Sequence, residues 1–432
     1  MYHMSRYCFR LFLVVALAVL VGGRHADAQT APRLREPDWS EVPQVEPPPR
    51  HSARSVILVD VDSRTVLHAH NPDLVVPPAS LTKVVAIDAA LVAAERGEVS
   101  LETTFVPPEV SWFERQPAGS SLMFLGPGQE LNLDDLLTGL AVASGNDAAI
   151  ALAMMLDGSV PAFADRMNAR MRELGLVDPF FVEPSGLSPQ NSITARSFAR
   201  FVLAHLERFP DTTERYFGLQ TYTYPDDRHR VSPAAGRPIT QANRNLLLWD
   251  FHGTDGLKTG YIGASGYHLA ATAVRDGRRL LVVVLGIDAD SHAVGGALRA
   301  AEAAELLEYG FRHFELVRLG YPDPDPVRVY RGRESYVVPD GPPELVVSVP
   351  AAQRDRIIGF REQEEAIVAP SPGVAVGRVG VRIGSVELVS HPLQLPAQEV
   401  GGFWRRIWDG FLLVLRRIAD RMGGREAPMR FL

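Results

Sequence analysis

The sequence predicts an α+β fold that is followed by a small all-β unit. Residues 55–67 and 267–285 have strand character, and helical periodicity fills much of the chain between them. Beyond Leu316 the composition changes to short Val-rich runs that are separated by turns. An amphipathic helical pattern then covers residues 403–422.

Length and charge limit the classes of protein that the sequence allows. The chain has 432 residues, of which 46% are hydrophobic, so it can form two or three domains with a large core. Its formal net charge of −7 argues against a nucleic acid as a partner, because binding phosphates requires a basic face. We therefore expect no nucleic-acid partner.

Residues 1–28 have the pattern of an export signal. Arg6 and Arg10 precede an apolar run at residues 11–21, and an Ala-Asp-Ala sequence at residues 26–28 resembles a cleavage site. The run is short for a membrane span, although an uncleaved anchor is the alternative. Cys8 is the only cysteine and would leave with the signal. We therefore expect an exported mature chain without disulfides, a thiol nucleophile or a lipid anchor on cysteine.

Residues 29–52 are rich in Pro, Glu and Arg, and they include three consecutive prolines at residues 47–49. This composition predicts a Pro-rich leader that is extended and exposed. The first domain is expected at residues 53–317. It begins with a strand at residues 55–60, a turn at residues 62–64 and a second strand from Thr65.

The helical part of this domain is predicted from the spacing of apolar residues. Pro77 and Pro78 end the first strands, and a helix follows from residue 81 to the stop at Arg96 and Gly97. A second helix is expected at residues 133–144. The other expected elements are helices at residues 148–156 and 161–174, strands at residues 267–273 and 280–285, and a helix at residues 297–311.

A second, β-rich domain is expected at residues 318–400. Residues 321–326 alternate Pro with Tyr and Asp, which is typical of a linker. Val-rich runs at residues 327–330 and 344–349 follow, with a turn signal at residues 339–341, and they predict a small all-β domain. This domain has no cluster of catalytic residue types, so we expect the chemistry in the first domain.

Lysine occurs only twice, at Lys83 and Lys258, although Lys and Arg together number 44. Arginine stays protonated in proteins, whereas a desolvated lysine can lose its proton and act as a base. Lys83 follows Ser80 by three residues at the start of a predicted helix, so the amine can reach the hydroxyl. This SxxK pattern fits an activated nucleophile with its base. A capped helix with a solvated lysine is the alternative.

Two further motifs occur in order along the chain. Ser144-Gly145-Asn146 offers a hydroxyl and a carboxamide that could relay a proton and orient an amide substrate, although a plain helix stop fits equally well. Lys258, Thr259 and Gly260 lie at the start of a strand. They offer a cation, a hydroxyl and a bare backbone edge to an extended anionic ligand, or else simply begin the strand. The three motifs together, with both lysines inside them, favour the catalytic interpretation.

These motifs, SxxK, SxN and KTG, are shared by penicillin-binding proteins and class A β-lactamases. From Ser55 to the C-terminus the chain resembles the low-molecular-mass penicillin-binding proteins, the serine D-alanyl-D-alanine carboxypeptidases. Sequences around the motifs and at residues 243–249, 266–269 and 309–311 carry the resemblance. It implies a transpeptidase domain like that of penicillin-binding proteins and β-lactamases, in which an antiparallel sheet packs with a helical region. A small all-β domain and a C-terminal amphipathic helix would follow.

The resemblance also implies roles for the residues of the motifs. Ser80 would be the acylated nucleophile, and Lys83 would be the base that takes its proton. Ser144 would shuttle the proton, and Asn146 would hold the substrate amide. Lys258 would keep the site electropositive and favour the neutral form of Lys83.

Substrate binding is implied for a second group of residues. Thr259 and Arg244 would bind the terminal carboxylate of the substrate, which suits the donors of a guanidinium. Gly260 would leave the strand edge open, and the backbone amides of Ser80 and Tyr261 are the candidates for an oxyanion hole. The family has another arginine after the strand that ends at Gly286. Residues 287–296 form a longer segment than usual, and Arg299 is the candidate for that arginine.

Two positions depart from the family pattern. Glu183 begins the sequence Glu-Pro-Ser-Gly-Leu, where the family usually has Asn-Pro-x-Gly-Leu. It resembles the acidic loop of class A β-lactamases but lacks the Glu-x-x-Leu-Asn spacing, so we interpret it as structural. Ser197 replaces a common aspartate, with an expected role in packing or at the start of a helix.

The C-terminal segment, residues 401–432, is expected to bind a membrane surface. Aromatic and aliphatic residues from Phe403 to Ile418 follow helical spacing, and arginines and aspartates occupy the other side. Charges this frequent exclude a span, whereas aromatic anchors opposite arginines are typical of an interfacial helix. The alternative is a helix that packs on its own domain or on a partner subunit.

These observations predict an exported serine D-Ala-D-Ala carboxypeptidase. It would trim the terminal D-alanine from peptidoglycan stem pentapeptides through an acyl-enzyme on Ser80, and β-lactam antibiotics would acylate it. A DD-endopeptidase, a β-lactamase of the same fold and a non-catalytic peptidoglycan-binding scaffold are the alternatives. No cofactor and no metal are expected, and the oligomeric state is left open. The expected location is the periplasm or the extracytoplasmic face of the bacterial cytoplasmic membrane, as a peripheral protein.

Overall fold

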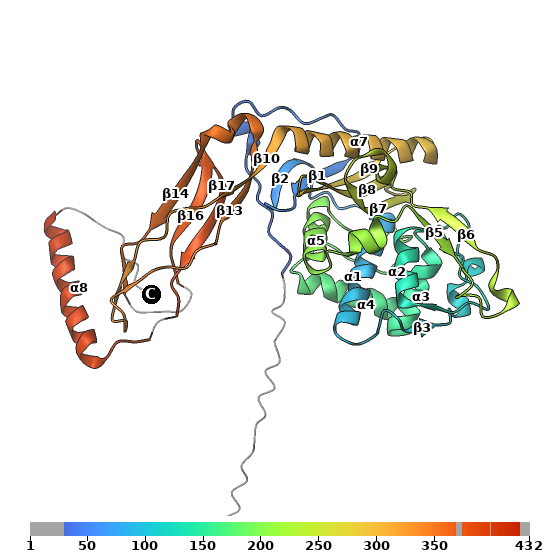
Figure 1. Ribbon diagram of the computed structural model, residues 1–432, viewed down its shortest axis with the longest axis horizontal. Helices are drawn as coiled ribbons and strands as arrows, with labels where there is room; N and C mark the ends of the chain where they lie inside the picture. Colours follow the sequence, from blue (N-terminus) through green and yellow to red (C-terminus); the bar gives the residue numbers. More distant parts are fainter. Residues whose placement is uncertain (1–29, 369–373, 398, 424–432) are drawn as a thin grey trace, which may run out of the picture.

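The computed structural model describes residues 30–368, 374–397 and 399–423, which form two units side by side with a helix at the far end of the second unit (Figure 1). The predicted signal at residues 1–28 lies outside the described residues. The first unit contains a five-stranded antiparallel sheet with helices on both faces, as expected for this α+β fold. The described residues of the second unit form strands and one short helical turn.

The sheet of the first unit has the strand order β2-β1-β9-β8-β7. β1 pairs along its full length with the middle of β9, with Ser55 opposite Leu285 and Asp60 opposite Leu280. Strands from the beginning and the end of the first unit are therefore neighbours in the sheet, because β9 lies beside β1. The strands are β1 (Ser55–Asp60), β2 (Thr65–His70), β7 (Thr254–Ile262), β8 (Gly266–Arg275) and β9 (Arg278–Ile287).

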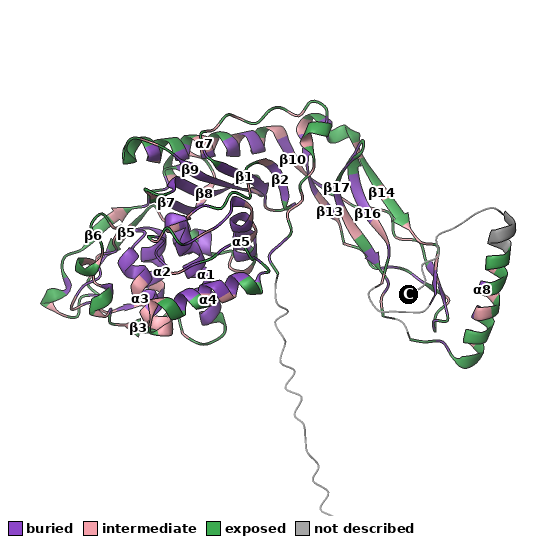
Figure 2. Cartoon of the chain, turned by 180° about the vertical axis from the view of Figure 1, so that it is seen from behind, coloured by how far each residue is buried: buried purple, intermediate pink, exposed green. Residues whose placement is uncertain are grey.

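Helices cover both faces of this sheet, so its central strands are apolar on both sides (Figure 2). The helical region on one face contains α1 (Thr82–Glu95), α2 (Leu133–Ala141), α3 (Asn146–Asp157), α4 (Val160–Glu173) and α5 (Ala195–Arg208). On β9, Leu281 and Val283 point into the core between the sheet and the helices α1 to α5. The intervening Val282 points to the opposite face and packs in the core beneath α7 (His292–His313).

Smaller elements complete the first unit around the helical region. Two short antiparallel pairs lie there, β3 (Thr104–Phe105) with β4 (Leu131–Asn132) and β5 (Thr221–Tyr224) with β6 (Ile239–Ala242). The remaining short pieces are α6 (Leu247–Asp250) and the turns η1 (Trp39–Glu41), η2 (Ala79–Leu81), η3 (Glu109–Ser111), η4 (Phe113–Arg115), η5 (Thr213–Phe217) and η6 (Pro233–Ala235).

The second unit encloses its own core of valines, leucines and isoleucines. β10 (Phe314–Leu319) follows α7 directly and pairs with β13 (Leu345–Pro350), so the chain enters this unit at Phe314. The other strands are β11 (Val327–Tyr330), β12 (Tyr336–Val337), β14 (Ile357–Gln363), β15 (Ala366–Val368), β16 (Ala375–Ile383) and β17 (Val386–Gln394), with the turn η7 (Ala351–Arg356) after β13.

The structure corrects two predicted helix boundaries. The helix predicted at 133–144 ends at Ala141, and the Ser144-Gly145-Asn146 motif leads into α3 instead of ending α2. The helix predicted at 297–311 begins earlier, at His292, because the Ser291 hydroxyl caps it by accepting a hydrogen bond from the Val294 N–H at 3.3 Å. Two glycines in its first turns, Gly295 and Gly296, had hidden this start.

The predicted exposed leader is extended, but parts of it are buried against the two units. Ala31 and Val42 are buried, and the Trp39 ring packs on Phe314. The Arg35 guanidinium donates to the Ser63 carbonyl at 2.7 Å in the first unit and to the Val346 carbonyl at 2.8 Å in the second. The leader therefore links the two units, and the prediction of an exposed segment was wrong at these residues.

Residues 321–326 lie inside the second unit, between β10 and β11, and do not link the two units. The Tyr321 hydroxyl donates to the Pro342 carbonyl at 2.5 Å, which fixes this segment to the β-rich unit. The prediction of a linker was therefore wrong, because a Pro-Asp alternation also fits a loop that packs between strands.

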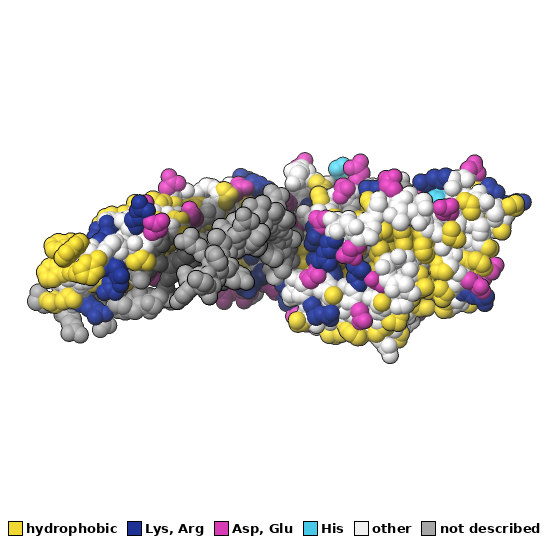
Figure 3. Space-filling view, turned by 90° about the horizontal axis from the view of Figure 1, so that it is seen from below, with side chains coloured by type: hydrophobic (Ala, Val, Ile, Leu, Met, Phe, Trp, Pro, Cys, Tyr) yellow, Lys and Arg dark blue, Asp and Glu magenta, His cyan; other side chains and the backbone are white. Residues whose placement is uncertain are grey.

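The last helix, α8 (Phe403–Gly423), stands at the end of the β-rich unit (Figure 1). It touches this unit through few side chains: Leu413 is buried beside Tyr330 and Val368, and the buried Asp409 carboxylate accepts a hydrogen bond from the Arg331 N–H at 2.6 Å. Its aromatic side faces outward, and Figure 3 shows hydrophobic and basic side chains together at this end. The exposed apolar residues are Phe403, Trp404, Ile407, Trp408, Phe411, Val414, Leu415 and Ile418.

Candidate active site

The first motif lies where the chain turns from a loop into α1. Ser80 is in the η2 turn, directly after Ala79, whose φ of 49° is unusual for a residue with a side chain. One helical turn later the Lys83 Nζ lies 3.1 Å from the Ser80 Oγ. The spacing that predicted this pair therefore places an amine within proton-transfer distance of a hydroxyl.

Lys83 is fully buried, and its amine has two further acceptors. Nζ donates to the Asn146 Oδ1 at 2.8 Å and to the Ser185 carbonyl at 2.5 Å. Burial lowers the pKa of Lys83 to about 7, and the Arg244 charge acts in the same direction, while Glu183 and Asp147 oppose the change. An amine with such a pKa is neutral in a large fraction of molecules near neutral pH, as a general base requires.

The second motif occupies the tight turn between α2 and α3. Ser144 has a φ of 59°, and its hydroxyl is buried without a hydrogen-bond partner among the described residues. The buried Asp147 carboxylate accepts hydrogen bonds from the N–H groups of residues 123–125 at 2.8 to 3.0 Å, which ties the turn to the loop that rims the site. These hydrogen bonds fix the turn, and the Ser144 hydroxyl keeps its hydrogen-bonding capacity available to a substrate.

The third motif lies on β7, which is one of the two edge strands of the sheet. Lys258 and Thr259 are buried, whereas Tyr261 is 41% exposed and lines the cavity. Burial and the neighbouring charges of Lys83, Arg244 and Arg299 lower the pKa of Lys258 well below its usual value. A carboxylate bound beside these cations would favour the protonated form of Lys258 again. An edge strand can also pair with an extended peptide.

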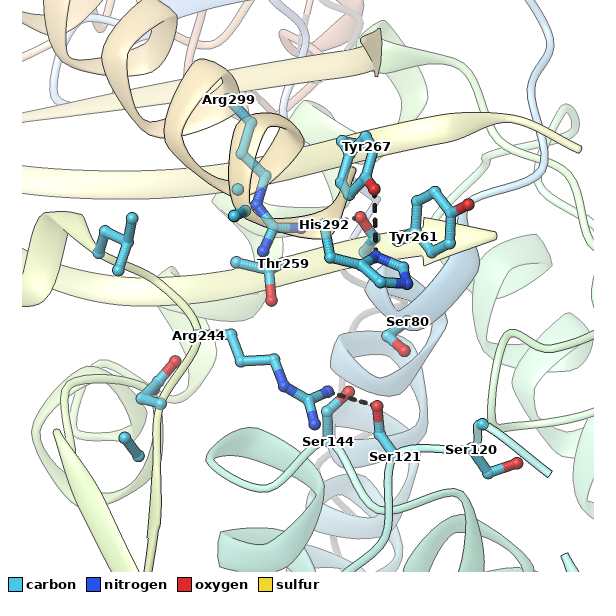
Figure 4. A pocket seen from close by; sticks show the side chains of 17 residues that line it. Ser80, Ser120, Ser121, Ser144, Arg244, Thr259, Tyr261, Tyr267, His292 and Arg299 are labelled. Atoms are coloured by element: carbon cyan, nitrogen blue, oxygen red, sulfur yellow. Dashed lines mark hydrogen bonds between the residues drawn. The ribbon is translucent and has the colours of Figure 1, made fainter. Parts of the chain in front are cut away.

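Two arginines face the same cavity from different elements (Figure 4). Arg244, in the loop after β6, donates to the Ser121 hydroxyl across the opening. Arg299, on α7, is buried and donates to the Gly260 carbonyl at 3.0 Å, and burial beside Arg244 lowers its pKa to about 10. The two guanidiniums lie near Thr259 and form a site for an anion.

The cavity that these elements enclose has a volume of about 620 Å³. Figure 4 shows Thr259 below Arg299 and the Arg244 guanidinium beside Ser144, so the hydroxyls of Ser80 and Ser144 and the two guanidiniums line one cavity. The predicted residues that line it are Ser80, Ser144, Arg244, Thr259, Gly260 and Tyr261, and Lys83, Asn146 and Lys258 lie behind them as buried residues.

Comparisons with known proteins identify the family. A profile described as D-alanyl-D-alanine carboxypeptidase matches residues 42–289. The chain belongs to this family. It is 34% identical over 370 residues to the D-alanyl-D-alanine carboxypeptidase DacC of Escherichia coli K12, covering 84% of this chain and 88% of that protein. It is 30% identical over 379 residues to DacA of Haemophilus influenzae, covering 85% and 91% of the two chains.

The fold is shared with a solved member of the group. The structure of penicillin-binding protein 5 from Haemophilus influenzae superposes with a TM-score of 0.72 at 30% identity, and it covers 83% of this chain and 100% of that one. The resemblance to penicillin-binding proteins and the α+β fold with its antiparallel sheet are thereby confirmed. This match extends into the β-rich unit, because 83% of the 432 residues is more than the part of the chain that precedes Phe314, whereas the family profile ends at residue 289.

The structure adds residues to the site of this D-alanyl-D-alanine carboxypeptidase. Arg299 lies in the cavity, as the family resemblance had suggested. Ser120, Ser121 and His292 also line it and had not been predicted. The adjacent serines after Gly119 gave no signal by themselves, because small polar residues in a loop are usually solvated. His292 was missed because the start of α7 was placed five residues too late.

The two departures from the family pattern have clear structural contacts. Ser197 and Thr194 form a reciprocal cap at the start of α5, with the Ser197 N–H donating to the Thr194 Oγ1 at 3.0 Å and the Thr194 N–H donating to the Ser197 Oγ at 3.1 Å. The expected role at the start of a helix is confirmed. Among the described residues, the Glu183 carboxylate accepts hydrogen bonds from its own loop, and this loop brings the Ser185 carbonyl to Lys83.

Proposed function

We propose that this carboxypeptidase removes the terminal D-alanine from peptidoglycan stem pentapeptides through an acyl-enzyme on Ser80. The observation that carries the proposal is the buried amine of Lys83, 3.1 Å from the Ser80 hydroxyl and with a pKa of about 7. Incubation of the purified enzyme with stem pentapeptides, followed by mass spectrometry, tests it. The expected product has lost one D-alanine, and cleavage of cross-linked dimers alone would instead indicate an endopeptidase.

Acylation begins when Lys83 takes the proton of Ser80. The Ser80 Oγ then forms a bond to the carbonyl carbon of the penultimate D-alanine, while the backbone N–H groups of Ser80 and Tyr261 stabilise the developing oxyanion. The peptide C–N bond breaks when the leaving amine receives a proton through the Ser144 hydroxyl. D-Alanine departs, and water hydrolyses the ester to regenerate Ser80.

Substrate binding depends on the cations and on the edge of β7. Arg244 and Thr259 would bind the terminal carboxylate, and Arg299 adds a second guanidinium near the same place. The peptide backbone would pair with Gly260 and Tyr261, and Asn146 would hold its amide. β-Lactam antibiotics present a carboxylate and a strained amide to the same groups, so we expect them to acylate Ser80.

The pH dependence of acylation follows from the state of Lys83. Its pKa is lowered to about 7, and only the neutral amine can accept the Ser80 proton. The rate constant for acylation by a fluorescent penicillin should therefore rise with pH through about 7 and level off above it. Rates measured from about pH 5 to about pH 9 provide the test. A rate that is flat or falls through neutrality would contradict the role of Lys83 as base.

The proposed location is the extracytoplasmic face of the cytoplasmic membrane, reached after export through the signal at residues 1–28. No single described helix is long and apolar enough to span a bilayer, and only α3 and α4 taken together reach the required length and composition. α8 would instead lie on the membrane surface. Its outward aromatic side, including Trp404 at 79% and Trp408 at 61% exposed, would enter the acyl boundary while its arginines meet anionic headgroups.

Removal of residues 401–432 should release an active and soluble enzyme, because every residue of the site lies before Ala301. Co-sedimentation with anionic vesicles measures binding, which should weaken with salt without vanishing. As a matched full-length variant, Trp404→Ser with Trp408→Ser should lower binding by roughly tenfold or more through lost apolar contact. If full-length and truncated chains pellet equally, the anchor lies elsewhere; if neither pellets, α8 packs against protein.

A further inference from the structure

The carboxylate of Glu183 is close enough to Lys83 for its charge to act on the amine, although it takes part in no step of the proposed mechanism. Its Oε2 accepts hydrogen bonds from the Ser185 N–H at 2.6 Å and the Ser185 Oγ at 2.5 Å. Its Oε1 accepts from the Ser188 N–H and the Asn191 Nδ2, each at 3.1 Å. A carboxylate that accepts four hydrogen bonds from one short segment holds that segment in a single conformation.

The turn that Glu183 holds contacts the nucleophile segment at three points. The Ser185 carbonyl accepts a hydrogen bond from the Lys83 Nζ at 2.5 Å. Gly186 has a φ of +80°, and a Cβ at this position would lie 1.8 Å from the Ala79 carbonyl oxygen, so the turn packs directly against the residue before Ser80. The Asn191 Nδ2 also donates to the Thr82 Oγ1 at 3.3 Å.

We propose that Glu183 is a positioning residue for Lys83: its carboxylate holds the turn that brings the Ser185 carbonyl to the lysine amine and adds a negative charge beside that amine. The inference deepens the proposed function and rests on it, because it concerns the base that activates Ser80. An asparagine, which the family usually has here, could not supply this charge.

The charge has a consequence for the pH at which Lys83 becomes a base. The charged groups that act on Lys83 are Glu183 of the turn, Asp147 of α3 and Arg244 of the loop after β6. Lys258 of β7 also neighbours Lys83, but burial and the surrounding cations lower its pKa well below its usual value. Glu183 is the stronger of the two anions that favour the charged amine. Loss of the Glu183 charge should therefore lower the pKa of Lys83 further, so that acylation begins at lower pH.

The test is the pH profile of acylation by a fluorescent penicillin in the full-length protein and in Glu183→Gln. The wild-type acid limb should have its midpoint near the Lys83 pKa of about 7. In Glu183→Gln the midpoint should move down by about one pH unit, the lower end of the effect of a nearby charge. The rate at high pH should fall roughly tenfold or more, because an amide cannot accept all four hydrogen bonds and the base is held less firmly.

Two further variants separate the effect of the Glu183 charge from the effect of its hydrogen bonds on the position of the turn. Ser185→Ala keeps the Glu183 charge and the carbonyl but removes one donor to Oε2, so it should slow acylation without moving the acid limb; it also tests the inference if Glu183→Gln fails to fold. Glu102→Gln removes a charge on an exposed residue outside the site and should change neither quantity.

An acid limb in Glu183→Gln that stays in place or moves to higher pH would overturn the inference, as would an undiminished rate in Ser185→Ala. These results would leave the proposed function intact, because Ser80 would still be labelled. A wild-type protein that penicillin does not label at all would refute the proposed function, and the inference with it.

Discussion

Ser80→Ala is expected to abolish labelling by a fluorescent penicillin and to reduce turnover of stem pentapeptides by about four orders of magnitude or more. The reason is that the Ser80 Oγ lies 3.1 Å from the buried amine of Lys83 and that Ser80 lines the cavity. Removal of the nucleophile in a serine hydrolase leaves only the weak contribution of binding and the oxyanion hole. Gel fluorescence and product release measure the two effects.

The cavity contains other serines, so the assignment needs a matched control. Ser120→Ala removes a second hydroxyl that lines the same cavity, and this variant should still be labelled. Mass spectrometry of the labelled wild-type protein should place the penicilloyl group on the peptide that contains Ser80. Persistent labelling of Ser80→Ala, or a modified peptide elsewhere in the chain, would refute the assignment of the nucleophile.

The sequence predicted that Ser80 and Lys83 lie within hydrogen-bond distance because their geometry is local. A serine and a lysine three residues apart at the start of a helix share a face whatever the rest of the chain does. The same holds for the β7 motif, since a strand fixes the alternation of Lys258 and Thr259. The sheet and most helices were predicted for a similar reason, because their apolar periodicity reports directly on the face that is buried.

Contacts between distant segments could not be predicted in this way. The Ser185 carbonyl meets Lys83 across 102 residues of sequence, and nothing in either segment specifies the other. The burial of Ala31 and Val42 in the leader likewise depends on the surfaces of two folded units. A segment rich in proline has the composition of a solvated chain until such surfaces exist.

The C-terminal helix has one feature that local sequence predicts and one that depends on a contact with a distant segment. Its amphipathic pattern predicted the helix and its two sides, and α8 spans Phe403–Gly423. The pattern could not tell which side would face the β-rich unit. An apolar stripe fits a helix that packs against protein, and it fits equally a helix that leaves this stripe exposed for a membrane surface. Here the buried Asp409 instead accepts a hydrogen bond from the Arg331 N–H, and the aromatic side is left exposed.

The two lysines should respond differently to replacement by arginine. Lys83→Arg is expected to be nearly as damaging as Lys83→Ala, with a loss of acylation rate of about three orders of magnitude, because arginine keeps the charge but cannot accept the Ser80 proton. Lys258→Arg should lose less, about tenfold to a hundredfold, because the carboxylate of the substrate needs a cation at this position. Acylation rates and steady-state turnover measure both effects.

Stability must be separated from chemistry in this comparison, since Lys83 and Lys258 are both buried and a guanidinium is larger than an ammonium. Thermal unfolding of each variant provides that control, and the rates are compared only among variants that remain folded at the assay temperature. A base that must be neutral predicts a large loss at position 83 even in a stable variant. Small and equal losses at both positions would instead show that the charge of the site, and not proton transfer, explains why these two lysines occur here.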